Sequence, residues 1–411
     1  MQEKVILHCD LNNFYASVEM QLNPELQGKA IAVCGDPAER HGIVLAKSYP
    51  AKAFGVTTGE PIWQAKKKCP QLITVSPNFK KYTEYSKRVF NIYVSYTPEV
   101  ESFGLDECWL DVTGCQKLFG SGERIANLIR EEVKEKTGLT ISVGVSFTKV
   151  FAKLGSDMKK PDAVSIISRE NFKTVAWRLP INEFLYVGRS TEKILNSVGI
   201  KTIGDIANTD ACVLEHLLGK IGTSLHSAAW GETSDIVKLY YSTQIPKSVS
   251  HGTTTFRDIN NNADARVVIY SLCEVIAFRL RRKSMMTRGV SISIRDSVLA
   301  VRSKQTKLLY ATSSADDIAE SAIRLLDSFY SFMTMLPLRS ISVNAYSLIS
   351  TIGGIQQTFF EKNPDKKQNL DSSIDRLREK YGFEIMKRGI VVSSDITQSS
   401  KHDDDSSTPF H

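Results

Sequence analysis

Three carboxylates stand at the ends of two short apolar segments that lie about ninety residues apart in the chain. Asp10 closes the apolar run 5–9, while Asp106 and Glu107 precede a second apolar run that ends at Asp111. The three side chains converge only if the two segments are neighbouring strands of one sheet. Two Mg²⁺ ions roughly 3.5–4 Å apart need bridging carboxylates, because hard cations prefer anionic oxygen ligands. The spacing favours a two-metal phosphoryl-transfer site, with solvated or capping acids in turns as the alternative interpretation.

Length and composition restrict the class of protein. At 411 residues, with 42% apolar and 24% charged residues, the chain is expected to form two to four globular domains. No apolar stretch reaches the roughly 18 residues that span a bilayer, and residues 3–10 read directly as a strand, so we expect a cytoplasmic protein without a membrane partner. Seven scattered cysteines without a Cys-x-x-Cys pair predict core thiols rather than disulfides or structural zinc.

Positive charge is concentrated in the C-terminal half of the chain. The net charge is +7, and residues 247–349 carry fourteen Lys and Arg against eight Asp and Glu. Between Arg279 and Lys307 the count is nine against the single Asp296. Lys and Arg that neutralise phosphates release condensed counterions, so such a patch indicates nucleic-acid binding. A solvated helix face is the alternative.

The order of elements in the N-terminal half predicts an antiparallel-containing α+β sheet. Alternating and helical apolar patterns predict strands and helices in turn, and both acidic sites fall at one edge of the predicted sheet. The expected strands are 3–10, 31–33, 43–46, 100–103, 108–112 and 139–145, with 31–33 and 43–46 as a hairpin, and the expected helices are 13–22, 79–96 and 122–137.

Four blocks of sequence resemble the signature motifs of the Y-family translesion DNA polymerases, in order and at the family's spacing. They are HCDLNNFYASVE at 8–19, SYPAKAFG at 48–55, GLDECWLDVTG at 104–114 and DMKKP at 157–161. The resemblance runs from about residue 3 to 349 and is nearest the bacterial DinB and UmuC-like branch.

This resemblance implies an α+β multidomain fold with a ferredoxin-like palm, small fingers, a helical thumb containing a helix-hairpin-helix, and an α/β little finger. The expected boundaries are 1–12 and 78–166 for the palm, 13–77 for the fingers, 167–232 for the thumb, 233–249 for a linker, 250–349 for the little finger and 350–411 for a C-terminal tail.

The resemblance also implies roles for residues near the three carboxylates. Asp10, Asp106 and Glu107 would be catalytic and hold two Mg²⁺ ions, with the Leu11 carbonyl as a further ligand. Nucleotide binding is expected of Phe14, Tyr15, Tyr49, Lys52 and Lys160. Among these, Tyr15 falls on the steric-gate position that excludes a 2′-hydroxyl, and Lys52 stands where the family usually has arginine. The planar guanidinium of arginine binds phosphate through two parallel hydrogen bonds, which a lysine ammonium cannot form. This change therefore predicts weaker nucleotide affinity.

Residues 184–204 resemble the helix-hairpin-helix that presents backbone amides to a DNA phosphate. Gly188, Lys201 and Gly204 are the expected DNA contacts, with a surface turn as the alternative. The hairpin normally reads Gly-x-Gly, but Tyr186 replaces the first glycine, and its Cβ is expected to hinder close approach of the phosphate.

In the expected little finger, strands 253–256, 289–295 and 341–346 alternate with helices 265–282 and 316–332. Outward-facing basic residues there would follow backbone phosphates without reading bases. The expected DNA contacts are Arg279, Arg282, Arg295, Arg302, Lys304 and Lys307.

Beyond residue 346 the pattern becomes irregular. Gln356, Phe359 and Phe360 are similar to the clamp-binding peptide of bacterial polymerases, although an aromatic pair in a tail also suits docking onto its own domain. Residues 370–381 read as a short amphipathic helix, and the composition of 393–411 is typical of a disordered end.

Taken together, the resemblance implies a template-directed, error-prone translesion DNA polymerase that acts in the response to DNA damage, as in the SOS response. Its partners would be primer-template DNA, dNTPs, a sliding clamp and a RecA or UmuD-like accessory protein, and the chain is expected to be monomeric. A catalytically weak or inert DNA-binding relative is the main alternative, although the three carboxylates are present. A nucleotidyl cyclase would not need the basic segment, and a high-fidelity polymerase would need larger fingers.

Overall fold

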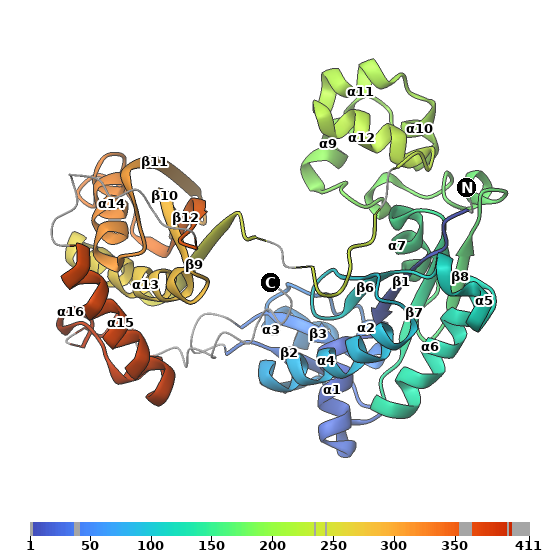
Figure 1. The fold of residues 1–411 in the computed structure, drawn as a ribbon, viewed down its shortest axis with the longest axis horizontal. Coiled ribbons are helices and arrows are strands. Elements are labelled where there is room, and N and C mark those ends of the chain that lie inside the picture. Colours follow the sequence, from blue (N-terminus) through green and yellow to red (C-terminus); the bar gives the residue numbers. More distant parts are fainter. Residues whose placement is uncertain are drawn as a thin grey trace. The chain divides into compact units, whose positions relative to one another are not determined.

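The computed structural model describes residues 3–36, 42–233, 236–242, 245–352, 364–392 and 394–396. These residues form two compact units, one holding the described parts of 3–35 and 43–242 and the other beginning at residue 245 (Figure 1). Each unit combines helices with mixed or antiparallel sheet, which confirms the predicted α+β class. Within the described residues, no helix has the length and apolar character needed to cross a membrane.

The first unit is built on a five-stranded sheet with the order β5-β6-β1-β7-β8. The central strand β1 (Ile6–Leu11) pairs antiparallel with β6 (Glu107–Asp111), the neighbour that the convergence of the carboxylates requires, and on its other side with β7 (Ile141–Ser146). Strand β5 (Val100–Ser102) pairs antiparallel with β6, and β8 (Val164–Ile167) pairs parallel with β7. The edge strand β8 was not predicted.

Both faces of this sheet are covered by helices, which is why every residue of β1 is buried. Side chains alternate along a strand, so Leu7, Cys9 and Leu11 face the core that α4 (Phe79–Tyr96) and α6 (Gly122–Thr137) complete. Ile6 faces the opposite way and packs with Trp109 and a residue of α7 (Lys149–Met158). His8 and Asp10 share that second face, beneath α7.

Helix α7 lies unusually close to the sheet at Gly144 of β7. A Cβ at Gly144 would stand 1.9 Å from the backbone oxygen of Ala152, and a Cβ at Gly155 would stand 3.2 Å from the Cα of Gly144. Only glycine fits this contact, because any side chain at position 144 would collide with the helix backbone. The close approach brings the polar side chains of α7 down onto the strand end that carries Asp10.

A smaller three-stranded sheet follows the first strand and helix of the chain, in the order β3-β2-β4. Strands β2 (Ile31–Cys34) and β3 (Val44–Lys47) form the predicted antiparallel pair, and β4 (Ile73–Val75), which was not predicted, adds parallel to β2. The helices of this region are α1 (Phe14–Leu22), α2 (Tyr49–Ala53) and α3 (Ile62–Lys68).

A helical cluster with its own apolar core completes the first unit. Its helices are α9 (Arg189–Ser197), α10 (Ile203–Asn208), α11 (Ala211–Leu218) and α12 (Lys220–Ala229), and α8 (Phe172–Val175) precedes them. The short helix α5 (Gln116–Phe119) belongs to the sheet region instead. After the cluster, the backbone N–H of Tyr240 donates to the Pro98 carbonyl at 2.9 Å, and that of Lys238 donates to the Glu101 carboxylate at 3.0 Å. The start of the predicted linker is therefore attached to the sheet region.

The second unit holds a four-stranded antiparallel sheet with the order β11-β10-β12-β9. Helices α13 (Asn262–Arg282) and α14 (Ala315–Asp327) pack against one face and enclose the core of this unit. The strands are β9 (Ser248–Ile259), β10 (Met285–Asp296), β11 (Val301–Thr312) and β12 (Leu338–Ser350). Strands β9, β10 and β12 are longer than the predicted strands, and β11 was not predicted.

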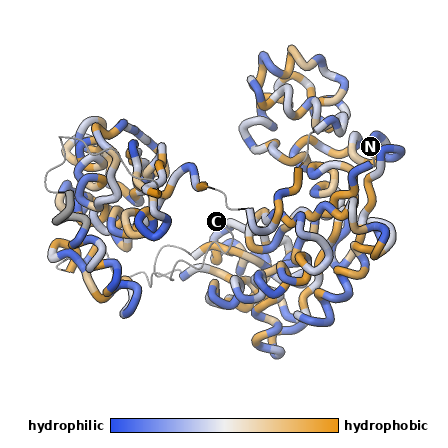
Figure 2. Tube along the Cα trace, viewed as in Figure 1, coloured by the Kyte–Doolittle hydropathy of each residue, from blue (hydrophilic) through white to orange (hydrophobic). Residues whose placement is uncertain are grey.

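The C-terminal helices α15 (Pro364–Tyr381) and α16 (Gly389–Val392) belong to the second unit. Figure 2 shows that α15 is mostly hydrophilic, and ion pairs rather than apolar contacts dominate its attachment. Arg378 and Arg388 both bind the carboxylate of Glu274, and Arg281 binds Asp375. Ile396, inside the segment expected to be disordered, is buried in the core. Asp395 beside it binds Arg257, while residues 393 and 397–411 lie outside the described residues.

Candidate active site

The strand register brings the three predicted carboxylates to one place. Asp10 of β1 lies directly opposite Glu107 of β6, and the Leu11 backbone N–H donates to the Asp106 carbonyl at 2.9 Å. Directly opposed residues on antiparallel strands hold their Cβ atoms roughly 5 Å apart on the same face. The predicted convergence of two distant segments at one strand end is therefore present in the fold.

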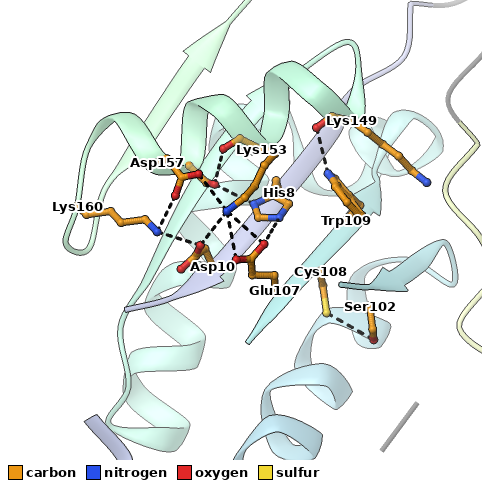
Figure 3. A network of polar contacts seen from close by, with 11 residues as sticks. His8, Asp10, Ser102, Glu107, Cys108, Trp109, Lys149, Lys153, Asp157 and Lys160 are labelled. Carbon is orange, nitrogen blue, oxygen red and sulfur yellow. Dashed lines mark hydrogen bonds and ion pairs between the residues drawn. The ribbon is translucent and has the colours of Figure 1, made fainter. Parts of the chain in front are cut away.

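Two lysines lie among these carboxylates (Figure 3). Lys153 Nζ lies 3.3 Å from Asp10 Oδ2, 3.2 Å from Glu107 Oε2 and 3.0 Å from Asp157 Oδ2. Lys160 Nζ lies 2.9 Å from Asp10 Oδ2 and 2.8 Å from Asp157 Oδ1. Lys160 was predicted, but Lys153 and Asp157 were not assigned roles. Their i,i+4 spacing on α7, next to the DMKKP motif, was the signal that could have identified them.

Buried polar contacts fix the loop that carries Lys160. Asn12 accepts the Asp162 backbone N–H at 2.9 Å and donates to the Ser142 hydroxyl at 2.9 Å. Arg130 donates to the Asp162 carbonyl at 2.9 Å. The position of Lys160 relative to Asp10 therefore depends on hydrogen bonds from the sheet and from α6.

Crowding of charge shifts the acidities of the carboxyl groups. Burial, and then repulsion from Glu107 and Asp10, raises the pKa of Asp106 to about 6. Burial also raises the pKa of Asp10, against the lowering effect of Lys160. For Glu107 burial acts to raise the pKa, but the neighbouring His8 imidazole and the charge of Lys153 bring it below its usual value. Burial lowers the pKa of the His8 imidazole, which favours its neutral form.

The raised pKa of Asp106 gives a testable dependence of stability on pH. The pKa of Asp106 in the folded protein lies above its unfolded value of about 4. Protonated Asp106 therefore contributes fully to the free energy of unfolding below pH 4, and this contribution is lost as the pH rises through 6. Without divalent cations, the free energy of unfolding of the wild type should fall relative to Asp106→Asn by on the order of 2 kcal/mol between pH 4 and 7.5. Urea unfolding in EDTA, followed by tryptophan fluorescence, measures this difference; a constant difference across that range would contradict the prediction.

The oxygen-rich composition of the site fits a hard divalent cation. Among the described residues, no three carboxylate, His or Cys side chains are already arranged around a single point as metal ligands. The ammonium groups of Lys153 and Lys160 instead supply positive charge beside the acids. Within the described residues, Glu107 Oε2 is buried and forms no hydrogen bond of ordinary geometry, although the Lys153 ammonium lies 3.2 Å away, and a bound cation would satisfy this oxygen.

The predicted nucleotide-binding residues border the same region. The Tyr15 ring stacks on Tyr82, with centroids 4.3 Å apart and planes 12° apart, and burial followed by the charge of Asp106 raises the pKa of Tyr15. Phe14 is buried in the core behind it. Burial also raises the pKa of Tyr49, which feels the charges of Lys160 and Asp10. Lys52 is exposed, with Nζ 5.8 Å from the Tyr49 ring centroid.

The predicted DNA contacts of the helical cluster have different environments. Gly188 caps the N-terminus of α9, and a Cβ there would meet no atom within 4 Å. Lys201 is exposed. Gly204 is buried in α10, where a Cβ would stand 3.0 Å from Trp177, so packing requires this glycine. All three DNA contacts stay predictions.

Tyr186 occupies the backbone conformation that the missing glycine would favour. Its φ is +71° and its side chain is 68% exposed. A left-handed conformation costs a residue with a Cβ roughly 1–2 kcal/mol, and glycine at this position would avoid that cost. The greater freedom of glycine in the unfolded chain offsets roughly 0.5–1 kcal/mol of the resulting gain in stability. Tyr186→Gly should raise the free energy of unfolding by about 0.5–1 kcal/mol in urea titrations.

Tyr186→Ala is the matched control, because it removes the ring but keeps the Cβ. It should not gain stability, and equal unfolding midpoints for the glycine and alanine variants would show that the backbone at position 186 is not strained. Only the glycine variant should also bind primer-template DNA more tightly than the wild type.

The basic residues of the second unit do not form one surface. The register pairs Arg302 with Ile294 and Lys304 with Ile292, so both point toward the helical face, and Lys304 donates to Ser328 at 2.8 Å. Arg279 and Arg282 lie on α13, which packs on that face. Arg295 and Lys307 have the opposite parity and point to the open face. A groove of about 280 Å³ on this face is lined by Arg295 and by residues with hydroxyl side chains, including Thr254, Ser293 and Ser340.

The predicted clamp-binding residues Gln356, Phe359 and Phe360 lie outside the described residues, and their role stays a prediction.

Comparisons with known proteins identify the family to which this chain is similar. A sequence model described as the impB/mucB/samB family matches residues 9–157, and the model of that family's C-terminal domain matches residues 246–359. The chain is 46% identical over 394 residues to DNA polymerase IV of Acetivibrio thermocellus, covering 95% of this chain and 98% of that protein. It is 35% identical over 388 residues to DNA polymerase IV of Pelotomaculum thermopropionicum, covering 94% and 95%. A solved Y-family DNA polymerase chimera, 26% identical, superposes with a TM-score of 0.73 and covers 84% of this chain and 99% of its own.

Proposed function

The chain belongs to the bacterial DinB-like Y-family and is a translesion, DNA-directed DNA polymerase, and we propose that it works by two-metal phosphoryl transfer at Asp10, Asp106 and Glu107. Membership implies DNA and dNTP substrates and a dependence on divalent metal. We propose Mg²⁺ as that metal, two ions per site, and error-prone synthesis as the outcome.

The observation that carries this proposal is the meeting of three carboxylates with two lysines at one strand end. The ions would be held by the carboxylates of Asp10, Asp106 and Glu107 and by the Leu11 carbonyl. All four groups supply oxygen ligands, and they come from adjacent positions on neighbouring strands. When bound, the ions would lower the pKa of the primer 3′-hydroxyl and offset the charge of the triphosphate. Lys153 and Lys160 hold the acids in place by ion pairing in the metal-free protein.

Residues beside the carboxylates are suited to bind the incoming nucleotide. Lys160 offers an ammonium group for the triphosphate, and Tyr49 offers a hydroxyl in the same electrostatic environment. The Tyr15 ring, supported by its stack on Tyr82, would collide with a 2′-hydroxyl of the incoming nucleotide. Lys52 would contribute a point charge without the bidentate geometry of arginine.

The small size of the fingers supports low fidelity. The described residues of this region contain three strands of three or four residues and α-helices of nine, five and seven residues. Fingers of this size have little surface that could contact a nascent base pair and exclude one of incorrect shape. We infer that mismatched and damaged templates are accepted.

Primer extension by the full chain with Mg²⁺ on matched undamaged and abasic templates tests this function. Metal-dependent extension with dNTPs that continues past the abasic site is the expected result. DNA binding without extension, with or without a sliding clamp, would instead favour the inert DNA-binding relative. The sliding clamp, RecA or UmuD-like partners, the monomeric state, the cytoplasmic location and a role in the SOS response stay predictions.

A further inference from the structure

His8 opens the motif at 8–19, but neither the resemblance nor the proposed chemistry gives its buried imidazole a role. It lies on β1 two residues before Asp10, on the face covered by α7, and its side chain is fully buried. Its Nε2 lies 3.3 Å from Glu107 Oε2, and its Nδ1 lies 2.8 Å from the Ser156 hydroxyl oxygen. The imidazole therefore bridges helix α7 and a proposed metal ligand (Figure 3).

His8 Nε2 and Glu107 Oε2 have few other polar atoms near them with which to form hydrogen bonds. Within the described residues, His8 Nε2 and Glu107 Oε2 are both buried and neither forms a hydrogen bond of ordinary geometry. Glu107 Oε2 has one other polar neighbour near it, the Lys153 ammonium at 3.2 Å. Trp109 packs edge-on against the His8 ring, with centroids 5.2 Å apart.

The direction of the hydrogen bond between Ser156 and Nδ1 decides which ring nitrogen carries the proton. Its hydroxyl can donate to His8 Nδ1 or to the Lys153 carbonyl, each at 2.8 Å. That carbonyl lies inside α7, where the backbone N–H four residues later is its ordinary partner. When the hydroxyl donates to Nδ1, the proton of the neutral ring is at Nε2, directed at Glu107.

We propose that His8, oriented by Ser156, is a positioning residue that holds the Glu107 carboxylate in the direction needed to bind a divalent cation. This inference rests on the proposed metal site and deepens it. An outer partner that hydrogen-bonds a ligand carboxylate fixes its rotamer, and removing such a partner typically weakens metal affinity about 10–100-fold. The 3.3 Å separation is longer than a usual charged hydrogen bond, so we expect the contact to shorten when Glu107 binds a cation.

Mn²⁺ binding to the full chain, followed by electron paramagnetic resonance of the free ion, tests the proposal without requiring activity. His8→Leu keeps a similar volume but has no N–H and should weaken Mn²⁺ binding about tenfold. His8→Gln restores a neutral N–H donor and should recover most of the affinity. Ser156→Ala should cause an intermediate loss. Ser146→Ala is the control, because it removes another buried hydroxyl from the same region, one that donates to the Ile167 carbonyl.

The outcomes separate this inference from the function on which it rests. Equal Mn²⁺ binding by wild type and Asp106→Ala would remove the metal site and with it the proposal. If Asp106→Ala loses the ion but folded His8→Leu keeps wild-type affinity, only the role of His8 is overturned. Should His8→Leu not fold, Ser156→Ala decides: affinity equal to that of Ser146→Ala overturns the proposal, and a selective loss supports it.

Discussion

Replacing Asp106 with alanine is expected to lower kcat/KM for dNTP incorporation by roughly 10³-fold, because metal-assisted phosphoryl transfer draws several kcal/mol of barrier reduction from its cations. Asp106 adjoins Leu11 through a backbone hydrogen bond and interacts electrostatically with Glu107 and Asp10. Its loss would leave two of the three acids that we propose to hold the ions. Single-nucleotide primer extension over a range of Mg²⁺ concentrations measures the effect.

Asp111→Asn is the matched control for this experiment. Asp111 lies at the other end of the same strand, opposite Ile6, and its carboxylate accepts hydrogen bonds from Thr113. An asparagine there keeps an acceptor oxygen and should leave kcat/KM within about threefold of wild type. Wild-type extension by Asp106→Ala would remove the assigned metal site.

Replacing Tyr15 with alanine is expected to reduce the preference for dNTPs over rNTPs by on the order of 100-fold. The ring is held in place by its stack on Tyr82 and by an edge contact with Phe79, 5.9 Å between centroids. A rigid ring excludes the 2′-hydroxyl more strictly than a mobile one, because it cannot move aside at low cost. The ratio of kcat/KM for matched dNTP and rNTP substrates is the measurement.

Tyr15→Phe separates the ring from its hydroxyl. Because the proposed exclusion is steric, phenylalanine should keep nearly all of the sugar discrimination. If discrimination fell equally in the alanine and phenylalanine variants, the hydroxyl rather than the ring would carry it. If it fell in neither, the gate would lie elsewhere.

The elements that the sequence predicted best are those with a strong buried pattern. Strand β1 and helices α4 and α6 follow apolar periodicities that leave little alternative, and the hairpin of β2 and β3 is flanked by clear turn residues. Strand β4 has three residues and is largely exposed, and most residues of β11 are exposed, so neither has an alternating burial signal. Such edge strands are recognised by their partners rather than by their own composition.

The carboxylates could be predicted from their positions after apolar runs, but their neighbours could not. Lys153 reaches Asp10 across 143 positions of sequence, and His8 reaches Ser156 across 148. These contacts arise because Gly144 lets α7 approach the sheet, which is a tertiary event with no local pattern. For the basic segment, the sequence suggested one continuous patch, but the strand register puts the basic side chains on both faces of the sheet. A high density of charge in the sequence does not show which face each residue of an edge strand takes.

The attachment of the C-terminal helices changes how genetic variation in this chain should be interpreted. Arg378, whose side chain is 4% exposed, and Arg388 together neutralise Glu274 on α13. A premature stop codon before position 378 would therefore remove both counter-charges of a carboxylate whose side chain is only 14% exposed, and the shortened protein would be destabilised in its second unit. Alleles truncated in this region should be classed with loss-of-fold mutations, not with harmless losses of a tail.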